Sequence, residues 1–266
     1  MKTGNNCPNC NHPVTDNFCS NCGQKKYKRI DKKYIFDELQ YIILHTNKGL
    51  LYSLKKIIRN PGKTAREFIG GNRVNHYKPI LLVFLLAGIS AFISFKIIDF
   101  HGINKEIYMQ KGTYSDFMQD IFSLFSSFFS FIMLLFIPVL AVFTKISFRK
   151  WGCNYYEHVI MDSYILSFFT VFEMLLFYPA MYLLRNNAEI FMHVAYLPGI
   201  SMPFILIWFY RGFFEDKPLK SIILRVLLLF LLLFIGFIIL VVAITVSLFV
   251  ALGQEAVFQY LNIQAI

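Results

Sequence analysis

The sequence is poor in charged residues: Asp, Glu, Lys and Arg make up only 16% of its 266 residues. In soluble globular domains about 25% of the residues are charged, so the composition excludes an ordinary water-soluble protein. Hydrophobic residues take their place, at 56% of the chain, and 30 residues are Phe. Such a composition is typical of a chain in lipid, and the sequence therefore predicts an integral membrane protein.

Short catalytic motifs are also missing. The sequence has no G-x-S-x-G turn, no H-E-x-x-H helix and no carboxylate cluster for a catalytic metal. Gly62-Lys63-Thr64 is not a phosphate-binding loop, because that motif needs a glycine where the chain has Ile57. We therefore expect no enzymatic activity. Internal repeats are absent as well, so sequence symmetry does not support a transporter with inverted repeats.

Cysteine is scarce, yet four of the five cysteines form two closely spaced pairs. The spacing is C-x2-C, eight residues and C-x2-C, and the four residues are Cys7, Cys10, Cys19 and Cys22. This spacing is typical of a tetrahedral zinc site, and Gly23 can adopt the positive φ of a tight turn. Four unrelated thiols or two disulfides are the alternatives. The regular pairs, and the remoteness of Cys153 along the chain, favour zinc.

The zinc hypothesis predicts a small zinc ribbon at residues 1–24 that binds one structural Zn²⁺. About twenty residues cannot bury a hydrophobic core, so the metal would supply most of the folding free energy, on the order of 10 kcal/mol. Four thiolate ligands leave no open position for a catalytic water. Zinc thiolates need a reducing compartment, and residues 1–6 do not resemble a signal peptide, so we expect a cytoplasmic ribbon. Nucleic acid is not an expected partner, because Lys2 is the only basic residue among the first 23.

Residues 25–78 are predicted to form a basic linker and amphipathic helices beside the membrane. Apolar residues recur at helical spacing at Ile35, Phe36, Leu39, Ile42 and Ile43. After a break at residues 46–49, the stripe restarts at Leu50, Leu51, Leu54, Ile57 and Ile58. Each segment has about 13 residues, too few for a bilayer that needs roughly twenty. We expect both to lie on the membrane or to pack on the helix bundle, although the stripe alone also fits a soluble two-helix domain.

Basic residues gather in the second half of this region. We call them the juxtamembrane basic residues, and they are Lys55, Lys56, Arg59, Lys63, Arg66, Arg73 and Lys78. Attraction to an anionic lipid surface is about 1 kcal/mol per charge, so we predict that they contact lipid headgroups and orient the chain. Asn60-Pro61-Gly62 is expected to end the preceding helix, and residues 63–69 to add one or two helical turns.

Residues 79–266 are predicted to form a bundle of about five transmembrane helices, which makes the fold all-α. The apolar spans are 79–98, 117–144, 157–182, 189–210 and 219–252. Pro79 suits the first position of the first helix, where a missing N–H costs nothing. The fifth span is longer than a perpendicular crossing needs, which predicts a tilted helix or a protruding end.

Prolines mark the expected irregularities of the other spans. Pro138 is expected to kink the second span, because it removes a hydrogen bond from the preceding turn. The third span is expected to end near Pro179. Pro198-Gly199 and Pro203 are expected to bend or break the fourth.

The distribution of basic residues orients the bundle. The segment before residue 79 and the two connections on its side hold 22 Lys and Arg, whereas the opposite side holds 4. Positive charge is retained in the cytoplasm, which places the N-terminus there and the C-terminus outside. We therefore expect a multi-pass protein of the cell (inner) membrane.

Ionisable residues within or beside the spans are functional hypotheses by default, and they are Glu157, His158, Asp162, Glu173 and His193. His158 and Asp162 are one helical turn apart, so the carboxylate can orient the imidazole or share a proton with it. Glu157 and His158 lie near the cytoplasmic edge, where ordinary interfacial residues are an equal alternative. Glu173 is deeper and is predicted to make an intramembrane contact, with His193 as its expected partner.

The chain resembles a family of uncharacterised bacterial membrane proteins catalogued as domain of unknown function 3667. The features that carry the resemblance are Phe18 to Gln24 of the ribbon, Leu54 to Gly62, Arg66 to Arg73 with Tyr77 and Pro79, and Tyr156-Glu157-His158 followed by Ser167-Phe168. The resemblance implies an integral membrane protein with a cytoplasmic zinc ribbon. It implies no activity.

Two functions remain open at this point. The first is a non-enzymatic adaptor or regulator, whose ribbon recruits a protein partner through a polar loop at residues 9–17 while the spans anchor it. The alternative is a transporter of small solutes or lipids that uses polar residues in spans three and four.

Overall fold

A computed structural model describes residues 6–7, 10–23, 49–72, 76–110, 112 and 115–252. The chain divides into two units, Met1–Asn47 and Lys48–Ile266, which are treated separately below. The first predicted amphipathic helix, the basic linker and Arg73 lie outside the described residues.

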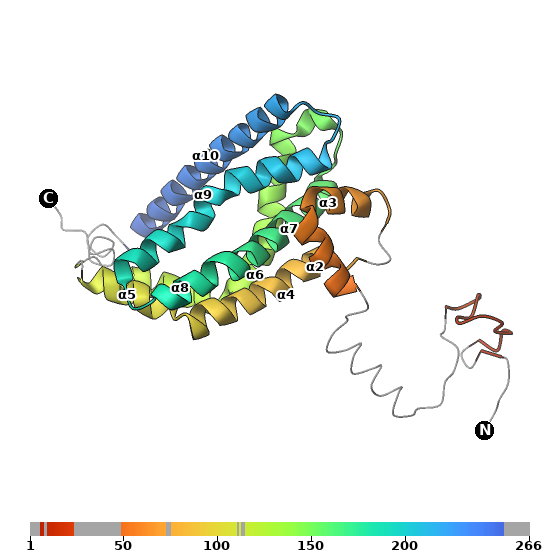
Figure 1. The fold of residues 1–266 in the computed structure, drawn as a ribbon, viewed down its shortest axis with the longest axis horizontal. Coiled ribbons are helices and arrows are strands. Elements are labelled where there is room, and N and C mark those ends of the chain that lie inside the picture. Colours follow the sequence, from red (N-terminus) through yellow and green to blue (C-terminus); the bar gives the residue numbers. More distant parts are fainter. Residues whose placement is uncertain are drawn as a thin grey trace, which may run out of the picture. The chain divides into compact units, whose positions relative to one another are not determined.

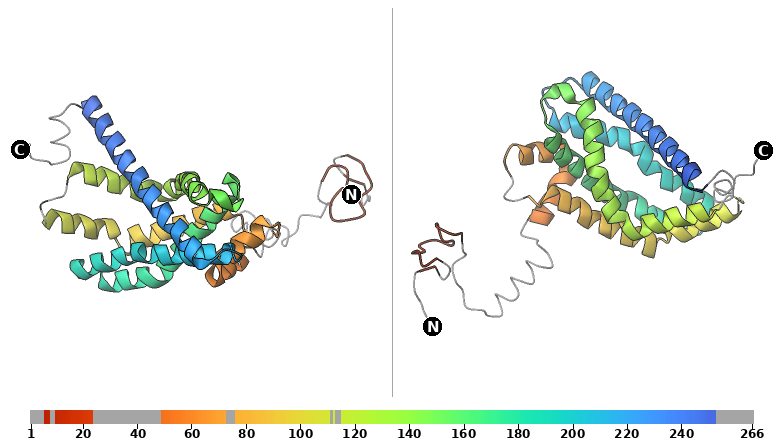
Figure 2. Two further views of the ribbon diagram at one scale, coloured as in Figure 1. Left: turned by 90° about the horizontal axis from the view of Figure 1, so that it is seen from above. Right: turned by 180° about the vertical axis from the view of Figure 1, so that it is seen from behind.

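The described part of the second unit is helical and holds no strand, as the sequence predicts. Five of its helical segments are long and apolar enough to cross a membrane: Pro79–Ile97, Gln119–Ser147, Tyr155–Leu184, Ala188–Phe213 and Leu219–Ser247. Figures 1 and 2 show these long helices lengthwise beside one another, with α2 and α3 at one end of the bundle and α5 at the other. The prediction of five spans is confirmed.

Span one consists of α4 (Pro79–Phe92) and a π-helical turn, η1 (Ile93–Ile97). Pro79 is at the start of α4, as predicted. In η1 the N–H of Ile98 reaches the carbonyl of Ile93, five residues back. No proline or glycine signals this wider turn in the sequence.

Span three continues through Pro179 instead of ending there. It consists of α7 (Tyr155–Phe172), the π-helical turn η3 (Glu173–Phe177) and α8 (Tyr178–Leu184). A proline within a helix clashes with the carbonyl four residues back and has no N–H for it. The wide turn just before Pro179 relieves this conflict, because Tyr178 donates to the carbonyl of Glu173 instead.

Span two, α6 (Asp116–Ser147), is irregular at Phe128 rather than at the predicted Pro138. Phe128 has φ −119° and ψ 17°, whereas Pro138 lies within regular helix. The hydroxyl of Ser126 donates to the carbonyl oxygen of Ser123 at 3.0 Å. Such side-chain competition for backbone carbonyls bends helices, and it explains why the break lies in the serine-rich half.

Span four, α9 (Ala188–Phe213), is one continuous helix that contains Pro198 and Pro203, so of the two predicted outcomes, a bend or a break, the break does not occur. Figure 1 shows it as a single curved ribbon. The hydroxyl of Ser201 donates to the carbonyl of Pro198 at 2.6 Å. Serine hydroxyls and small local adjustments allow transmembrane helices to accommodate proline without breaking.

Two short helices precede the spans. They are α2 (Gly49–Arg59) and α3 (Pro61–Ile69), and Asn60 caps α3 by accepting a hydrogen bond from the N–H of Lys63 at 2.9 Å. Both pack on the bundle, which was one of the two predicted placements. Ile57 is fully buried, whereas Leu51 of the same predicted stripe is exposed.

A further helix, α5 (Phe100–Gln110), lies in the connection between spans one and two. The side chain of Asp99 accepts a hydrogen bond from the N–H of Gly102 at 3.2 Å. Ile103 packs beside the fully buried Phe191 of α9.

The largest buried cluster lies where α3, α7, α9 and the start of α10 (Leu219–Leu252) meet. Its largest fully buried side chains are Tyr164, Tyr210, Phe148 and Phe209. The rings of Phe148 and Tyr210 stack with centroids 4.0 Å apart. Beyond Leu229 nearly all the large apolar side chains of α10 are exposed or only half-buried, so this half of the helix offers its surface to lipid.

Candidate functional site

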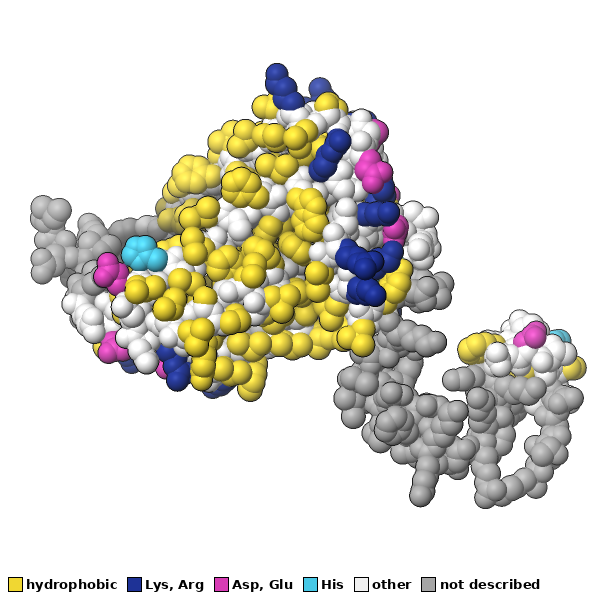
Figure 3. All heavy atoms as spheres, viewed as in Figure 1, with side chains coloured by type: hydrophobic (Ala, Val, Ile, Leu, Met, Phe, Trp, Pro, Cys, Tyr) yellow, Lys and Arg dark blue, Asp and Glu magenta, His cyan; other side chains and the backbone are white. Residues whose placement is uncertain are grey.

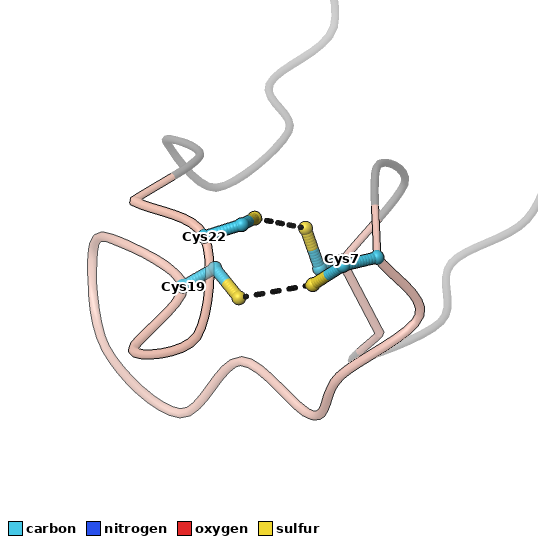
Figure 4. Close-up of side chains that lie close together, drawn as sticks. Cys7, Cys19 and Cys22 are labelled. Atoms are coloured by element: carbon cyan, nitrogen blue, oxygen red, sulfur yellow. Dashed lines mark hydrogen bonds between the residues drawn. The ribbon is translucent and has the colours of Figure 1, made fainter.

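The four predicted zinc ligands lie together in the first unit. Their sulfur atoms are all within 4.8 Å of one another, and Figure 4 shows side chains from the two pairs turned toward a common centre. The Sγ atoms of Cys7 and Cys22 are 3.5 Å apart, and those of Cys10 and Cys19 are 3.6 Å apart. Cys7 and Cys19 are each 2% exposed.

Each pair closes with the same backbone turn. Asn11 follows the first pair at φ 61°, and Gly23 follows the second at φ 74°. The N–H of each donates to the carbonyl of the first cysteine of its pair, Cys7 or Cys19, at 2.9 Å. The predicted positive φ of Gly23 is confirmed, and the structure adds Asn11 as its counterpart, because Asn tolerates this conformation better than most residues.

The geometry of the sulfurs fits one tetrahedral metal ion. Zinc–sulfur bonds of about 2.3 Å place the sulfurs of a tetrahedron about 3.8 Å apart, close to the observed separations. A disulfide needs sulfurs at about 2.0 Å, and all four thiols are free. The residues present therefore fit a four-thiolate metal site, with Cys7, Cys10, Cys19 and Cys22 as the ligands.

Between the two pairs the module exposes one large apolar side chain. Phe18 is 58% exposed, although it is directly before the buried Cys19. His12 and Asp16 are also exposed. Among the described residues of the module, Val14 is the one aliphatic side chain buried with the sulfurs.

Two of the juxtamembrane basic residues form ion pairs within the protein. Lys56 contacts Glu67 at 3.3 Å, which raises the pKa of the lysine. Arg66 contacts Glu215, in the connection after α9, at 2.5 Å. The guanidinium donates a hydrogen bond to this carboxylate and lowers the pKa of Glu215.

The other described juxtamembrane basic residues are exposed, and they are Lys55, Arg59, Lys63 and Lys78. They lie at the α2 and α3 end of the bundle. In Figure 3 most of the visible Lys and Arg side chains gather at this end, beside a face covered by hydrophobic side chains. This arrangement fits a protein whose basic end meets an aqueous surface.

His76 is a buried residue of this region that the sequence did not single out. Its ring is 5.1 Å from that of Tyr52 and 5.9 Å from that of Phe68, both in edge-on geometry. Its Nδ1 atom is 3.4 Å from the hydroxyl of Tyr164 in span three. Burial lowers the pKa of His76.

His158 and Asp162 are both fully buried within α7. They are not hydrogen-bonded to each other; instead, Oδ2 of Asp162 accepts a hydrogen bond from the hydroxyl of Thr144 at 2.9 Å. Within the described part of the chain, several buried polar atoms here have no hydrogen-bond partner: both ring nitrogens of His158, Oδ1 of Asp162, Oγ of Ser147 and the hydroxyl of Tyr210. Buried polar atoms are nearly always paired, so this group marks an unusual polar centre in the bundle.

The other three intramembrane candidates lie apart from this centre. Glu157 forms a capping box at the start of α7, accepting from the N–H of Asn154 at 2.7 Å. Glu173 begins the π-helical turn η3 and is partly buried. His193 is exposed, and its Nδ1 donates to the backbone carbonyl of Glu189 at 2.7 Å. Among the described residues no ion pair joins Glu173 to His193.

A protein-family model described as "Protein of unknown function (DUF3667)" matches residues 47–91. The family resemblance is thus confirmed over α2, α3 and most of α4. The cysteine pairs and Tyr156-Glu157-His158 lie outside the matched segment. Neither the curated proteins nor the solved structures contain a match.

Proposed function

We propose that this polytopic membrane protein is a non-enzymatic adaptor, whose N-terminal module binds one structural Zn²⁺ and recruits a cytoplasmic protein partner. Four thiolates at tetrahedral spacing favour zinc over harder divalent ions. They also fill its coordination shell, which leaves the metal no position for substrate. The metal then serves to hold the loop between the pairs in one conformation.

The observation that carries the proposal is the exposure of Phe18. A module this small has little apolar area to spare, yet its one phenylalanine is 58% exposed beside a buried metal ligand. Aromatic side chains that a partner buries contribute much of the binding energy of protein interfaces. The neighbouring polar residues Asp16 and Asn17 are exposed and suit the rim of such a contact.

A crosslinking experiment tests the adaptor. A photoreactive phenylalanine analogue replaces Phe18 in one variant and Thr15, also exposed in the same loop, in a control. We expect one defined adduct from position 18 after purification in detergent. Deleting residues 1–24, or the change Phe18→Ser, should remove the partner, and the Ser variant should keep its zinc. Equal adducts from both positions, or a partner that persists without the module, would count against the proposal.

In this proposal the bundle anchors the module in the cell membrane with the N-terminus in the cytoplasm. The exposed residues Lys55, Arg59, Lys63 and Lys78 contact anionic headgroups, each contributing about 1 kcal/mol near the surface. Arg66 and Lys56 have their charges matched by Glu215 and Glu67, so they contribute less.

The buried polar centre favours a second candidate function, transport of a small solute. Fully buried groups such as His158 and Asp162 are costly in lipid and often mark a pathway. Glu173 lies further along the same span, and the change Glu173→Gln distinguishes the two functions. An adaptor should keep its melting temperature and its phenotype, whereas a transporter that uses this carboxylate should stay folded and lose its phenotype. Liposome flux that survives deletion of residues 1–24 would favour transport.

A further inference from the structure

A cavity of about 500 Å³ lies at the end of the bundle opposite α2 and α3 (Figure 1). Its wall includes side chains from the end of span one, from α5 and from α6: Lys96, Asp99, His101, Lys105, Ser126 and Ser127. Its volume is within the range of about 300–1,000 Å³ that small-molecule sites occupy. Lys96, Asp99 and Ser127 are exposed, so the cavity opens to the surface of the bundle.

Three irregular stretches of backbone meet at this cavity. Lys96 belongs to the π-helical turn η1, and Asp99 follows it with a left-handed φ of 59°. Ser126 and Ser127 directly precede the break in α6 at Phe128. Irregular backbone at membrane depth is tolerated where it lines a polar cavity, and π-helical turns often accompany functional sites. None of the prolines explains these departures.

The charges around the cavity favour an anion. Among the lining residues Lys96 and Lys105 carry positive charge, and Asp99 carries the one negative charge. Lysine binds phosphate as a point charge, and the hydroxyls of Ser126 and Ser127 can donate hydrogen bonds to phosphate oxygens.

We propose that this cavity binds a phosphate group through Lys96 and Lys105. The phosphate of a membrane phospholipid and that of a water-soluble phosphate monoester share this chemistry. Large apolar side chains close in sequence to the lining residues, on the same two spans, are exposed, namely Phe92, Ile97, Phe125 and Phe128. They offer a surface for acyl chains next to the headgroup. The phosphate site does not involve the cysteine module, so this proposal can be tested separately from the adaptor function.

Native mass spectrometry of the full-length protein in detergent tests the site, with dioleoylphosphatidylglycerol as the probe. The double variant Lys96→Gln/Lys105→Gln should bind it about 30-fold more weakly, from two lysines near a lipid phosphate. The control Lys150→Gln/Lys220→Gln removes the same charge at the opposite end and should change binding less than twofold. An equal loss in both variants, or no loss in the first, overturns the proposal.

A single change at Asp99 tests whether the cavity prefers a negatively charged ligand. Asn keeps an acceptor for the N–H of Gly102 and tolerates the left-handed φ, so Asp99→Asn should melt like the native protein. Removing the carboxylate should tighten phosphatidylglycerol binding about two- to fivefold. Weaker binding by this variant would contradict an anion site, and the result remains decisive if the double lysine variant fails to fold.

A competition experiment distinguishes the two sources of phosphate. Glycerol 3-phosphate at millimolar concentration should not displace the lipid if the acyl chains contribute, and dioleoylglycerol, which lacks phosphate, should not bind. Displacement by glycerol 3-phosphate that also requires Lys96 and Lys105 would identify a soluble phosphate monoester as the ligand. Binding of dioleoylglycerol as tight as that of the phospholipid would refute a phosphate site.

Discussion

Two residues in left-handed conformation, Asn11 and Gly23, turn the chain back after each cysteine pair. These turns bring Cys7 and Cys19, the first cysteine of each pair, into the buried part of the module. The thiols replace a hydrophobic core, since Val14 is the only aliphatic residue buried with them in the described part of the module. We therefore expect a module built in this way to need the proposed metal for folding.

Loss of a single ligand should therefore release the metal. We predict that Cys19→Ser lowers the zinc content from one ion per chain to well below one half, because a neutral hydroxyl is a poor zinc ligand. Metal analysis of the purified protein measures this. The control is Cys153→Ser, which removes the one cysteine remote from the pairs and should leave the zinc content unchanged. Full zinc content in the Cys19 variant would disprove the assignment.

We expect His76 to make the stability of the juxtamembrane helices depend on pH. Burial is the main cause of its lowered pKa; Lys56 lowers it further and Glu67 partly opposes the shift. In the unfolded chain a histidine has a pKa near 6.5. The unfolded state therefore binds more protons than the folded state below about pH 6.5, so this contribution to stability is complete above that pH and is lost as the pH falls.

We predict that the melting temperature of the protein in detergent falls between pH 7.5 and pH 5, and that His76→Gln reduces this fall. Glutamine can still hydrogen-bond to Tyr164 but does not titrate in this range. Thermal melts of both proteins at a series of pH values measure the difference. Parallel pH profiles for the two proteins would show that His76 does not contribute.

At the scale of elements, α3 is held against α9 by close backbone contact. A Cβ atom at Gly62 would overlap the carbonyl oxygen of Phe209 and would be 2.8 Å from the backbone nitrogen of Phe213. Further along α9, a Cβ at Gly212 would meet the side chain of Asn60, the residue that caps α3. The contact at Gly62 is made by the backbone of α9, so rotation of a side chain cannot relieve it.

Gly62→Ala should therefore destabilise the bundle, by about 1–3 kcal/mol as expected for overpacking. Gly199→Ala is the matched control, because nothing lies within 4 Å of a Cβ at that position in α9. Alanine there should be neutral or stabilising by up to about 1 kcal/mol, through helix propensity. Melting temperatures in detergent compare the two. Equal effects would show that α3 is not closely packed on α9.

The elements that could be predicted from the sequence are those with strong local signals. Long apolar runs indicate the five spans, and the spacing of the cysteines indicates their cluster. The break at Phe128 and the π-helical turn Ile93–Ile97 could not be predicted, because no proline or glycine marks them. At Pro198 the sequence left a bend and a break open, because a proline is a strong local signal whose outcome depends on the surrounding helix.

The contacts of the candidate site were harder to predict than its residues. His158 and Asp162 are one turn apart, yet the carboxylate bonds to Thr144 on another span. Arg66 and Glu215 are 149 residues apart in sequence and meet only because α3 packs on α9. Such partners depend on tertiary packing, which cannot be predicted from residue spacing within one helix.

At the scale of the whole molecule, α10 buries less of its surface within the protein than the other four candidate spans do. It has 34 residues, about 51 Å of helix, whereas the hydrocarbon core of a bilayer is about 30 Å thick. Only its first half contributes to the buried cluster, through Ile222, Val226 and Leu229. We therefore still expect the excess length to be accommodated by tilt or by an end that projects from the membrane.

With five spans, the chain before the first span and the chain after the last span lie on opposite sides of the membrane. Basic residues gather at the end that holds α2, α3 and the start of α10, and the rule that positive charge stays inside predicts that this end faces the cytoplasm. A four-thiolate metal site requires the same compartment for the N-terminal module. The two arguments are independent, because one rests on lysine and arginine and the other on cysteine.

We predict that a reporter active only outside the cytoplasm gives signal when fused after Ile266 and none when fused before Met1. A reporter active only inside should give the reverse pattern, which guards against a fusion that merely fails to fold. A third fusion after Asp216, in the connection between α9 and α10, should behave like the N-terminal one, because an even number of spans separates them. Outside activity at Met1 with silence at Ile266 would invert the topology, and it would also place the thiolates in an oxidising compartment, where two disulfides rather than zinc would be expected.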